Sequence, residues 1–166
     1  MAALAADLVV AAQALLETCR AAGNPTIATA ESCTGGLIAA AITAIPGSSK
    51  WYDRSFVVYA NKAKIDMLGV PKDLLKTEGA VSEACAIAMA EGVLAKSPVE
   101  AAVAVTGIAG PDGGSPERPV GLVHMAAIRR GRPARHERHI FPGDRDQVRH
   151  ATVLVALDLL GRAIRE

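Results

Sequence analysis

The feature that most constrains the fold is a continuous run of small apolar residues at positions 101–106, Ala-Ala-Val-Ala-Val-Thr, which ends at Gly107. Such a run is typical of a strand that is covered on both faces, because a half-exposed strand alternates apolar and polar residues. Half of the chain is apolar (51%) but only 3% is aromatic, so Ala, Val, Leu and Ile must build the core. Small core residues suit helices that pack closely on a parallel sheet.

Helical and strand patterns alternate along the rest of the chain. A first helical pattern extends to about Ala22 and ends at Gly23-Asn24-Pro25. Further strands are predicted at 26–29, 51–60, 120–128 and 135–141, the last one antiparallel, and further helices at 37–45, 61–68, 82–94 and 144–165, with Ser82 and Asp144 as caps. We therefore predict a three-layer α/β/α sandwich with a mixed, mostly parallel central sheet, formed by one domain over residues 1–166.

Composition and charge argue against several classes of protein. A net charge of +1 and few aromatic residues disfavour nucleic acid as a partner. The cysteines Cys19, Cys33 and Cys85 form no C-x-x-C pair, so we expect neither a disulfide framework nor a metal site. Residues 1–16 include Asp7 and lack a basic start, which predicts an amphipathic helix rather than a signal peptide or membrane anchor. We expect a cytoplasmic homo-oligomer, a dimer or higher, because the helices are rich in alanine with few charged faces.

Hydroxyl and thiol side chains gather in the stretch Ala30-Glu31-Ser32-Cys33-Thr34-Gly35-Gly36, between a predicted strand and a predicted helix. The first backbone N–H groups of a helix have no partner within the helix and face whatever lies before them. Ser32 in such a turn is a cap, a phosphate ligand or a nucleophile, and spacing alone leaves the three open. The stretch matches neither G-x-S-x-G nor the Walker pattern nor G-x-G-x-x-G.

A nucleophilic serine needs a base, and Lys64 is the candidate. His124 and His139 fall within predicted strands, where we expect structural roles for them. Lys64 lies one turn into the helix that follows the strand ending near Tyr59, so its amine can point back to the strand end, whereas Lys62 faces roughly 200° away. A desolvated lysine loses its charge readily and then accepts a proton. The alternative for Lys64 is an exposed, solvated side chain.

Two other places put polar groups near strand ends. The loop at 107–114 is rich in glycine, so its backbone N–H groups are candidates to bind a phosphate or an oxyanion, although it is also readable as a surface connection. Arg145 and Arg149 lie at the start of the last predicted helix, where either is able to hold an anion through bidentate contact. The alternative for each arginine is a solvated helix face.

The motifs occur in an order that resembles one known family. They are Ala30-Glu31-Ser32-Cys33-Thr34-Gly35-Gly36, Tyr59-x-Asn61-x-x-Lys64, Gly79-Ala80-Val81-Ser82, Thr106-Gly107-Ile108-Ala109-Gly110-Pro111 and Phe141-x-Gly143-x-Arg145. Over residues 26–160 the chain resembles the CinA C-terminal domain family, in its single-domain form. Characterised members of that family are nicotinamide mononucleotide deamidases, also called the stand-alone PncC type.

The resemblance implies an amidohydrolase of pyridine nucleotide salvage, which converts nicotinamide mononucleotide to nicotinate mononucleotide and ammonia. Carried over by position, Ser32 is the nucleophile, Lys64 its base and Tyr59 a partner in the proton network. The implied substrate-binding residues are Cys33, Thr34, Gly35, Gly36, Asn61, Thr106, Gly107, Ile108, Ala109 and Gly110, with Arg145 or Arg149. The expected partner is this small nucleotide, without a cofactor or metal. Formation of an acyl-serine and direct activation of water both stay open.

A second hypothesis is a non-catalytic module that binds a nucleotide or docks a partner, in keeping with the competence and DNA-damage names attached to the family. It predicts thermal stabilisation by the ligand without turnover.

Overall fold

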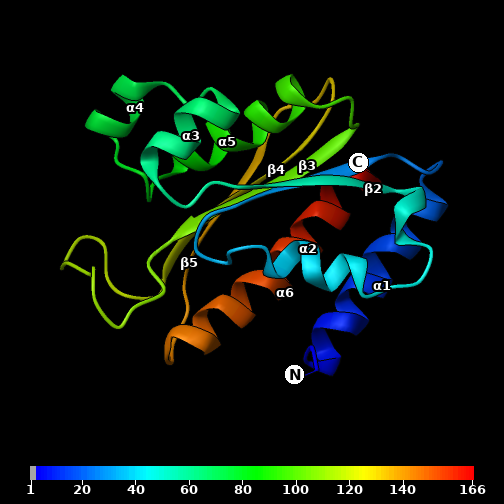
Figure 1. Ribbon diagram of the computed structural model, residues 1–166, viewed down its shortest axis with the longest axis horizontal. Coiled ribbons are helices and arrows are strands. Elements are labelled where there is room, and N and C mark those ends of the chain that lie inside the picture. The colour runs from blue at the N-terminus through cyan, green and yellow to red at the C-terminus, as the bar shows by residue number, and fades with distance from the viewer. Residues whose placement is uncertain (1–2) are drawn as a thin grey trace.

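The computed structural model describes residues 3–166, and its centre is one five-stranded sheet with the strand order β2-β1-β3-β4-β5 (Figure 1). The strands are β1 (Ile27–Glu31), β2 (Tyr52–Val57), β3 (Ala101–Gly107), β4 (Leu122–Arg129) and β5 (Arg135–Ile140). β1 pairs in parallel with β2 and β3, whereas β4 is antiparallel to both β3 and β5. Four strands therefore share one direction and β4 opposes them, so the prediction of a mixed, mostly parallel sheet is confirmed.

Helices cover both faces of the sheet, which confirms the predicted three layers. In Figure 1, α3, α4 and α5 lie above the sheet and α1, α2 and α6 lie below it. The helices are α1 (Ala6–Ala21), α2 (Leu37–Thr43), α3 (Asn61–Leu68), α4 (Lys72–Thr77), α5 (Glu83–Lys96) and α6 (Arg145–Arg165), with a 3-10 turn at Ser48–Lys50. None of the described helices is both long and apolar enough to pass through a bilayer.

The core is divided by the sheet into two apolar clusters, and β3 contributes to both. Ala101, Val103 and Val105 pack toward α1, α2 and α6, while Ala102 and Ala104 pack toward α5. Alternate residues of a strand point to opposite faces. A strand between two helical layers is therefore apolar throughout, as residues 101–105 are.

The predicted caps are confirmed, whereas one helix was not predicted. The Ser82 hydroxyl accepts a hydrogen bond from the Cys85 N–H, and Asp144 forms a capping box with Gln147 at the start of α6. These caps satisfy N–H groups that have no partner within their helices. The short helix α4 lies in a stretch for which no helix was predicted. Met1 and Ala2, within the range predicted for the first helix, lie outside the described residues.

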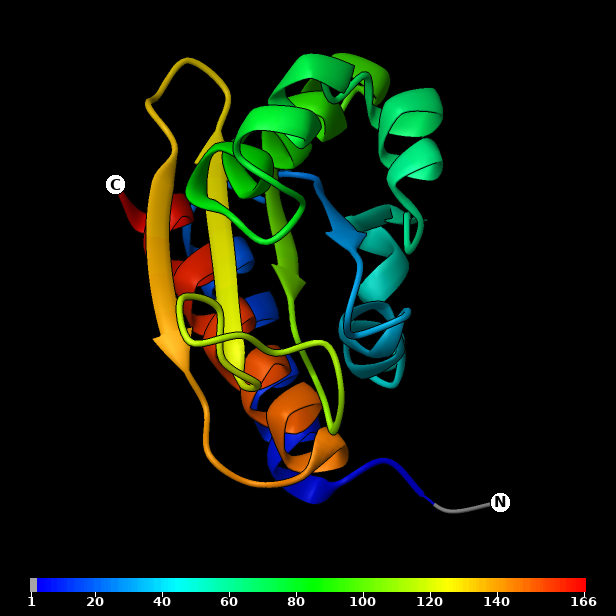
Figure 2. The same ribbon diagram turned by 90° about the vertical axis from the view of Figure 1, so that its left-hand side faces the viewer.

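The parallel strands β1, β2 and β3 all end at the same side of the sheet. In the strand register, Glu31 at the end of β1 is level with Val57 of β2 and Val105 of β3. The residues that follow these strands therefore meet at one end of the molecule, on the left of Figure 1. Figure 2 looks onto that end, and the yellow-green loop after β3 lies toward the viewer. Ligands of α/β proteins bind at this end of a parallel sheet.

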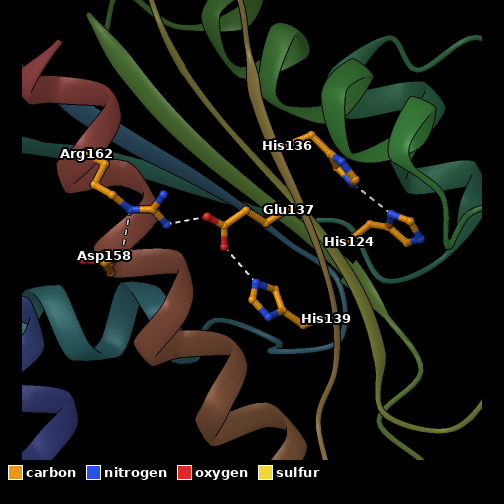
Figure 3. A network of polar contacts seen from close by, with 6 residues as sticks. All are labelled: His124, His136, Glu137, His139, Asp158 and Arg162. Atoms are coloured by element: carbon orange, nitrogen blue, oxygen red, sulfur yellow. Dashed lines mark hydrogen bonds and ion pairs between the residues drawn. The ribbon is translucent and has the colours of Figure 1, made fainter.

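The two histidines that were expected to be structural belong to polar contacts on opposite faces of β5 (Figure 3). His124 on β4 is buried, and its Nδ1 lies 2.9 Å from Nε2 of His136. On the other face, Glu137 contacts His139 and Arg162. Burial, with a smaller contribution from the charge of His136, lowers the pKa of His124 from 6.5 to about 4. The folded protein therefore holds this imidazole in its neutral form.

We expect this buried imidazole to make the fold less stable in mild acid. The unfolded chain takes up a proton on His124 near pH 6.5, while the folded chain does so only near pH 4. The free energy of unfolding therefore has its full value above pH 6.5 and decreases as the pH falls toward 4. Between pH 7 and pH 5 it falls by about 2 kcal/mol. Urea unfolding at the two pH values measures this loss. The variant His124→Gln should abolish most of it, and the surface variant His150→Gln should not; an unchanged loss in His124→Gln would contradict the assignment.

Candidate active site

Ser32 lies directly after β1, in the turn that leads into α2. Its N–H donates to the Val105 carbonyl (3.2 Å), and its own carbonyl accepts from the Gly35 N–H (3.1 Å). Gly35 and Gly36 have φ angles of 58° and 101°, which glycine adopts without strain and other residues rarely do. The two glycines therefore allow the chain to turn sharply while β3 fixes the backbone of Ser32.

Lys64 contacts Ser32 from the neighbouring strand end. Its helix, α3, follows β2, and its side chain is only 1% exposed. The amine Nζ lies 3.1 Å from the Ser32 Oγ, 2.9 Å from the Val58 carbonyl oxygen and 3.0 Å from the Tyr59 carbonyl oxygen. Burial lowers the pKa of Lys64 below its ordinary value. By contrast, Lys62 lies on the solvent side of α3 and pairs with Asp66.

The three oxygen partners of the Lys64 amine fit both of its protonation states. A neutral amine has two N–H groups and one lone pair, whereas an ammonium has three N–H groups and no acceptor. An ammonium would donate to all three oxygens, whereas a neutral amine would donate to the carbonyls of Val58 and Tyr59 and keep its lone pair for the Ser32 hydroxyl. Burial lowers the pKa of Lys64 and so favours the neutral state, in which the hydroxyl donates to Nζ and the amine lies in place to take the serine proton.

The other two candidate side chains of the turn are engaged in different ways. Burial raises the pKa of the Cys33 thiol to about 11, so this thiol is protonated at neutral pH and a poor nucleophile. The Thr34 hydroxyl donates to Glu31 Oε2 at 2.6 Å. Ser32 is therefore the residue of the turn with both a hydroxyl and a basic partner.

Glu31 makes several contacts in the site, although no role was predicted for it from the sequence. Its buried carboxylate accepts hydrogen bonds from the backbone N–H groups of Gly36, Ile38 and Ala39 at 2.9–3.1 Å, and from Thr34. The expectation that the start of α2 presents free N–H groups to a ligand is thus wrong for these three donors. The capping role considered for Ser32 is also not observed, because Glu31 satisfies the helix start. An acid just before a helix was the available signal, since negative charge is favourable there.

The side chains of Tyr59 and Asn61 lie on the exposed side of the site. Tyr59 is 64% exposed, and its hydroxyl lies 3.3 Å from Arg145 Nη2, while only its backbone carbonyl contacts the Lys64 amine. Asn61 is exposed at the start of α3. A proton network that includes the Tyr59 hydroxyl is not formed in this arrangement. The exposed Tyr59 hydroxyl instead contacts Arg145.

The strand end and loop after β3 form the adjacent wall. The Thr106 hydroxyl is buried and donates to the Ala80 carbonyl at 2.7 Å, which joins this strand to the Gly79-Ala80-Val81-Ser82 segment. Gly107 packs so tightly against β4 that a Cβ there would lie 2.7 Å from a Val123 methyl carbon. The Ile108 N–H donates to the Leu122 carbonyl, so it is already paired. Ala109 and Gly110 are buried before the exposed stretch 111–118.

The two arginines of α6 reach the site in different ways. Arg149 donates to the carbonyls of Cys33 (3.2 Å) and Thr34 (3.1 Å), so it supports the turn of Ser32. Arg145 is exposed and joins the Gly110 carbonyl (2.7 Å) to the Tyr59 hydroxyl. Of the two, Arg145 has the more exposed side chain.

The side chains gathered at the site are a serine hydroxyl and a lysine amine, with arginines at the edge. Within residues 3–166 there is no group of three or more His, Cys, Asp or Glu side chains that could hold a metal ion. The structure brings Ser32 and Lys64 together and places the turn, the loop after β3 and Arg145 around them. Such an arrangement can deliver a serine oxygen to an electrophile and accept its proton.

Comparisons with known proteins agree over nearly the whole chain. The family described as CinA C-terminal domain matches residues 10–164. A CinA-like protein from Syntrophotalea carbinolica is 49% identical over 137 residues, which cover 82% of this chain and 33% of that protein. The chain thus spans about a third of the length of the curated relatives it matches.

Solved structures share the fold closely. The competence/damage inducible protein CihA from Agrobacterium tumefaciens has a TM-score of 0.93 at 47% identity, with all of both chains covered. A competence-damaged protein (CinA) superfamily protein from Escherichia coli has a TM-score of 0.88 at 34% identity, with 96% of this chain and 92% of that chain covered. The α/β/α arrangement is therefore that of these proteins.

Proposed function

Since the chain belongs to the CinA C-terminal domain family, we propose that it is a serine amidohydrolase that releases ammonia from nicotinamide mononucleotide. One observation carries the proposal: a buried lysine amine lies 3.1 Å from the hydroxyl of Ser32. An amide is a weak electrophile, so its hydrolysis needs an activated nucleophile. The Ser32 and Lys64 pair supplies one without a metal.

The proposed reaction has two halves. Lys64 takes the Ser32 proton as Oγ attacks the carboxamide carbon, and the Lys64 ammonium then gives that proton to the leaving nitrogen, which departs as ammonia. Water next attacks the acyl-serine with Lys64 as base, and the proton that Lys64 takes from the water passes to the Ser32 oxygen as the carboxylic acid product is released. Atoms balance as amide plus water giving carboxylic acid plus ammonia. The lysine serves as base and acid in turn.

Stabilisation of the negative oxygen in this reaction is assigned to the turn after Ser32. The Gly35 and Gly36 N–H groups already donate to Ser32 and Glu31. The N–H groups of Cys33 and Thr34 take part in none of the hydrogen bonds found among residues 3–166, so they are the donors available for an oxyanion. A donor of this kind lowers the barrier by roughly 3 kcal/mol.

The phosphate of the mononucleotide is assigned to Arg145. This guanidinium is exposed at the edge of the site, between Gly110 and Tyr59, and a guanidinium binds phosphate oxygens in bidentate fashion. Arg149 is less exposed than Arg145 and holds the backbone of Cys33 and Thr34. The exposed faces of Tyr59 and Val57 offer apolar contact for the rest of the ligand.

We expect the purified protein to release one ammonia for each nicotinate mononucleotide formed, which a coupled ammonia assay and chromatography of the product measure. Addition of hydroxylamine should trap the acyl group as a hydroxamate. Stabilisation of the protein by the mononucleotide without release of ammonia would contradict the proposal and favour the non-catalytic module.

A further inference from the structure

Glu31 has an unusual environment for a carboxylate beside a reactive serine. It is fully buried, and it accepts hydrogen bonds from Thr34, from three backbone N–H groups of α2 and, more weakly, from Thr29 and Ser55. Hydrogen bonds to an ionised acceptor are about twice as strong as neutral ones. These bonds join the last residue of β1 to the first turn of α2, and Ser32 lies between the two.

The start of α2 depends on this one side chain. The helix has seven residues, and its N-cap, Gly36, has no side chain to cap it. Without Glu31, the Gly36, Ile38 and Ala39 N–H groups would lose their acceptor, and unpaired N–H groups at a helix start are costly when they are buried. The turn that carries Ser32 would then keep its contacts with β3 and Arg149 but lose the one that joins β1 to the start of α2.

We propose that Glu31 is a positioning residue for Ser32: its carboxylate fixes α2 against β1, so that the serine oxygen stays against the Lys64 amine while the Cys33 and Thr34 N–H groups remain open. Glu31 does not touch the reacting atoms. Its carboxylate also occupies the N–H groups of Gly36, Ile38 and Ala39, so these donors are not open to the substrate phosphate. The substrate part of this inference rests on the proposed function.

The test is the reactivity of Ser32 in Glu31→Asp and Glu31→Gln. The Asp variant keeps the carboxylate, but its side chain is shorter by one methylene, so the oxygens lie farther from α2. The Gln variant keeps the side-chain length but loses the charge and one acceptor oxygen. Displacement of a reactive group by about 1 Å can slow a reaction roughly 100-fold. We therefore expect labelling of Ser32 by a fluorophosphonate to slow about 100-fold in the Asp variant and about tenfold in the Gln variant. With nicotinamide mononucleotide, kcat should fall in parallel and KM should stay within about twofold, because Arg145 is unaffected.

Two further variants separate positioning from general stability. Ser55→Ala removes a donor to Glu31 from the β2 side, at 3.4 Å, and should label within twofold of the wild type. Thr34→Val removes the 2.6 Å donor on the α2 side and should label several-fold more slowly, which keeps the inference testable if the Glu31 variants do not fold. Melting temperatures show which variants are folded at the assay temperature.

Labelling of Ser32 tests the positioning role of Glu31, and release of ammonia tests the proposed substrate. Folded Glu31 variants, or a folded Thr34→Val, that label at the wild-type rate would overturn the positioning role. If the wild type labels at Ser32 but releases no ammonia from nicotinamide mononucleotide, the proposed substrate is wrong and the labelling rates still decide the role of Glu31. If the wild type does not label at Ser32, both proposals fail.

Discussion

Ser32→Ala should lower the release of ammonia from nicotinamide mononucleotide by at least roughly 10⁴-fold. Removal of the nucleophile of a serine hydrolase abolishes the covalent route and leaves only the contribution of substrate binding and oxyanion donors. The Ser32 side chain makes its hydrogen bond to Lys64 alone, so the fold should tolerate the change. Turnover of variant and wild type is compared with the same ammonia assay at saturating substrate.

Ser97→Ala is a matched control for the loss of a buried hydroxyl. Ser97 is 8% exposed and Ser32 7% exposed, but Ser97 lies at the end of α5 and donates to the Val93 carbonyl. We expect a small loss of stability and wild-type turnover in this variant. Wild-type turnover in Ser32→Ala would mean that Ser32 is not the nucleophile.

Lys64→Met should reduce turnover by roughly 10³-fold or more, because methionine fills similar space but has no lone pair able to take the serine proton. Lys64→Arg should not restore activity, since a guanidinium stays protonated. The exposed variant Lys62→Met, which loses only the surface pair with Asp66, should behave as the wild type. Added methylamine should partly restore Lys64→Ala, and absence of any rescue together with near-normal turnover in Lys64→Met would contradict the role.

The pH dependence of turnover tests whether Lys64 acts as the base in its neutral form. Burial lowers the pKa of Lys64 below 10.5, and only the neutral amine accepts the Ser32 proton. The ratio kcat/KM should therefore rise with pH to a plateau, and the midpoint of the rise should lie below pH 10.5. The variant Lys64→Met should lack that rise.

The layers of the fold follow from sequence because they rest on local patterns of sufficient length. The apolar run of β3 and the helical repeats of α1 and α6 each extend over many residues, and each has a clear end signal. The helix α4 has only six residues, of which Leu75 alone is buried. A helix of less than two turns shows no apolar periodicity that would distinguish it from a loop.

The site was predictable as a set of strand ends but not as a set of contacts. The position of Lys64 one turn into α3 was enough to direct it toward Ser32, since helix geometry is regular. The target of Arg149 was not, because its carbonyl partners lie 115 and 116 residues away in sequence. Glu31 was visible in the motif as an acid ahead of a helix, but the motif did not show that its carboxylate accepts hydrogen bonds from three N–H groups at the start of α2.

The three partners of the Lys64 amine are a hydroxyl and two backbone carbonyls, and none carries a formal charge. Many catalytic bases are oriented by a carboxylate, whose attraction weakens in salt and disappears in acid. A base held by main-chain dipoles inside the protein is beyond the reach of dissolved ions, which screen mainly exposed charges. Dissolved ions should therefore have little effect on the contacts that hold the Lys64 amine.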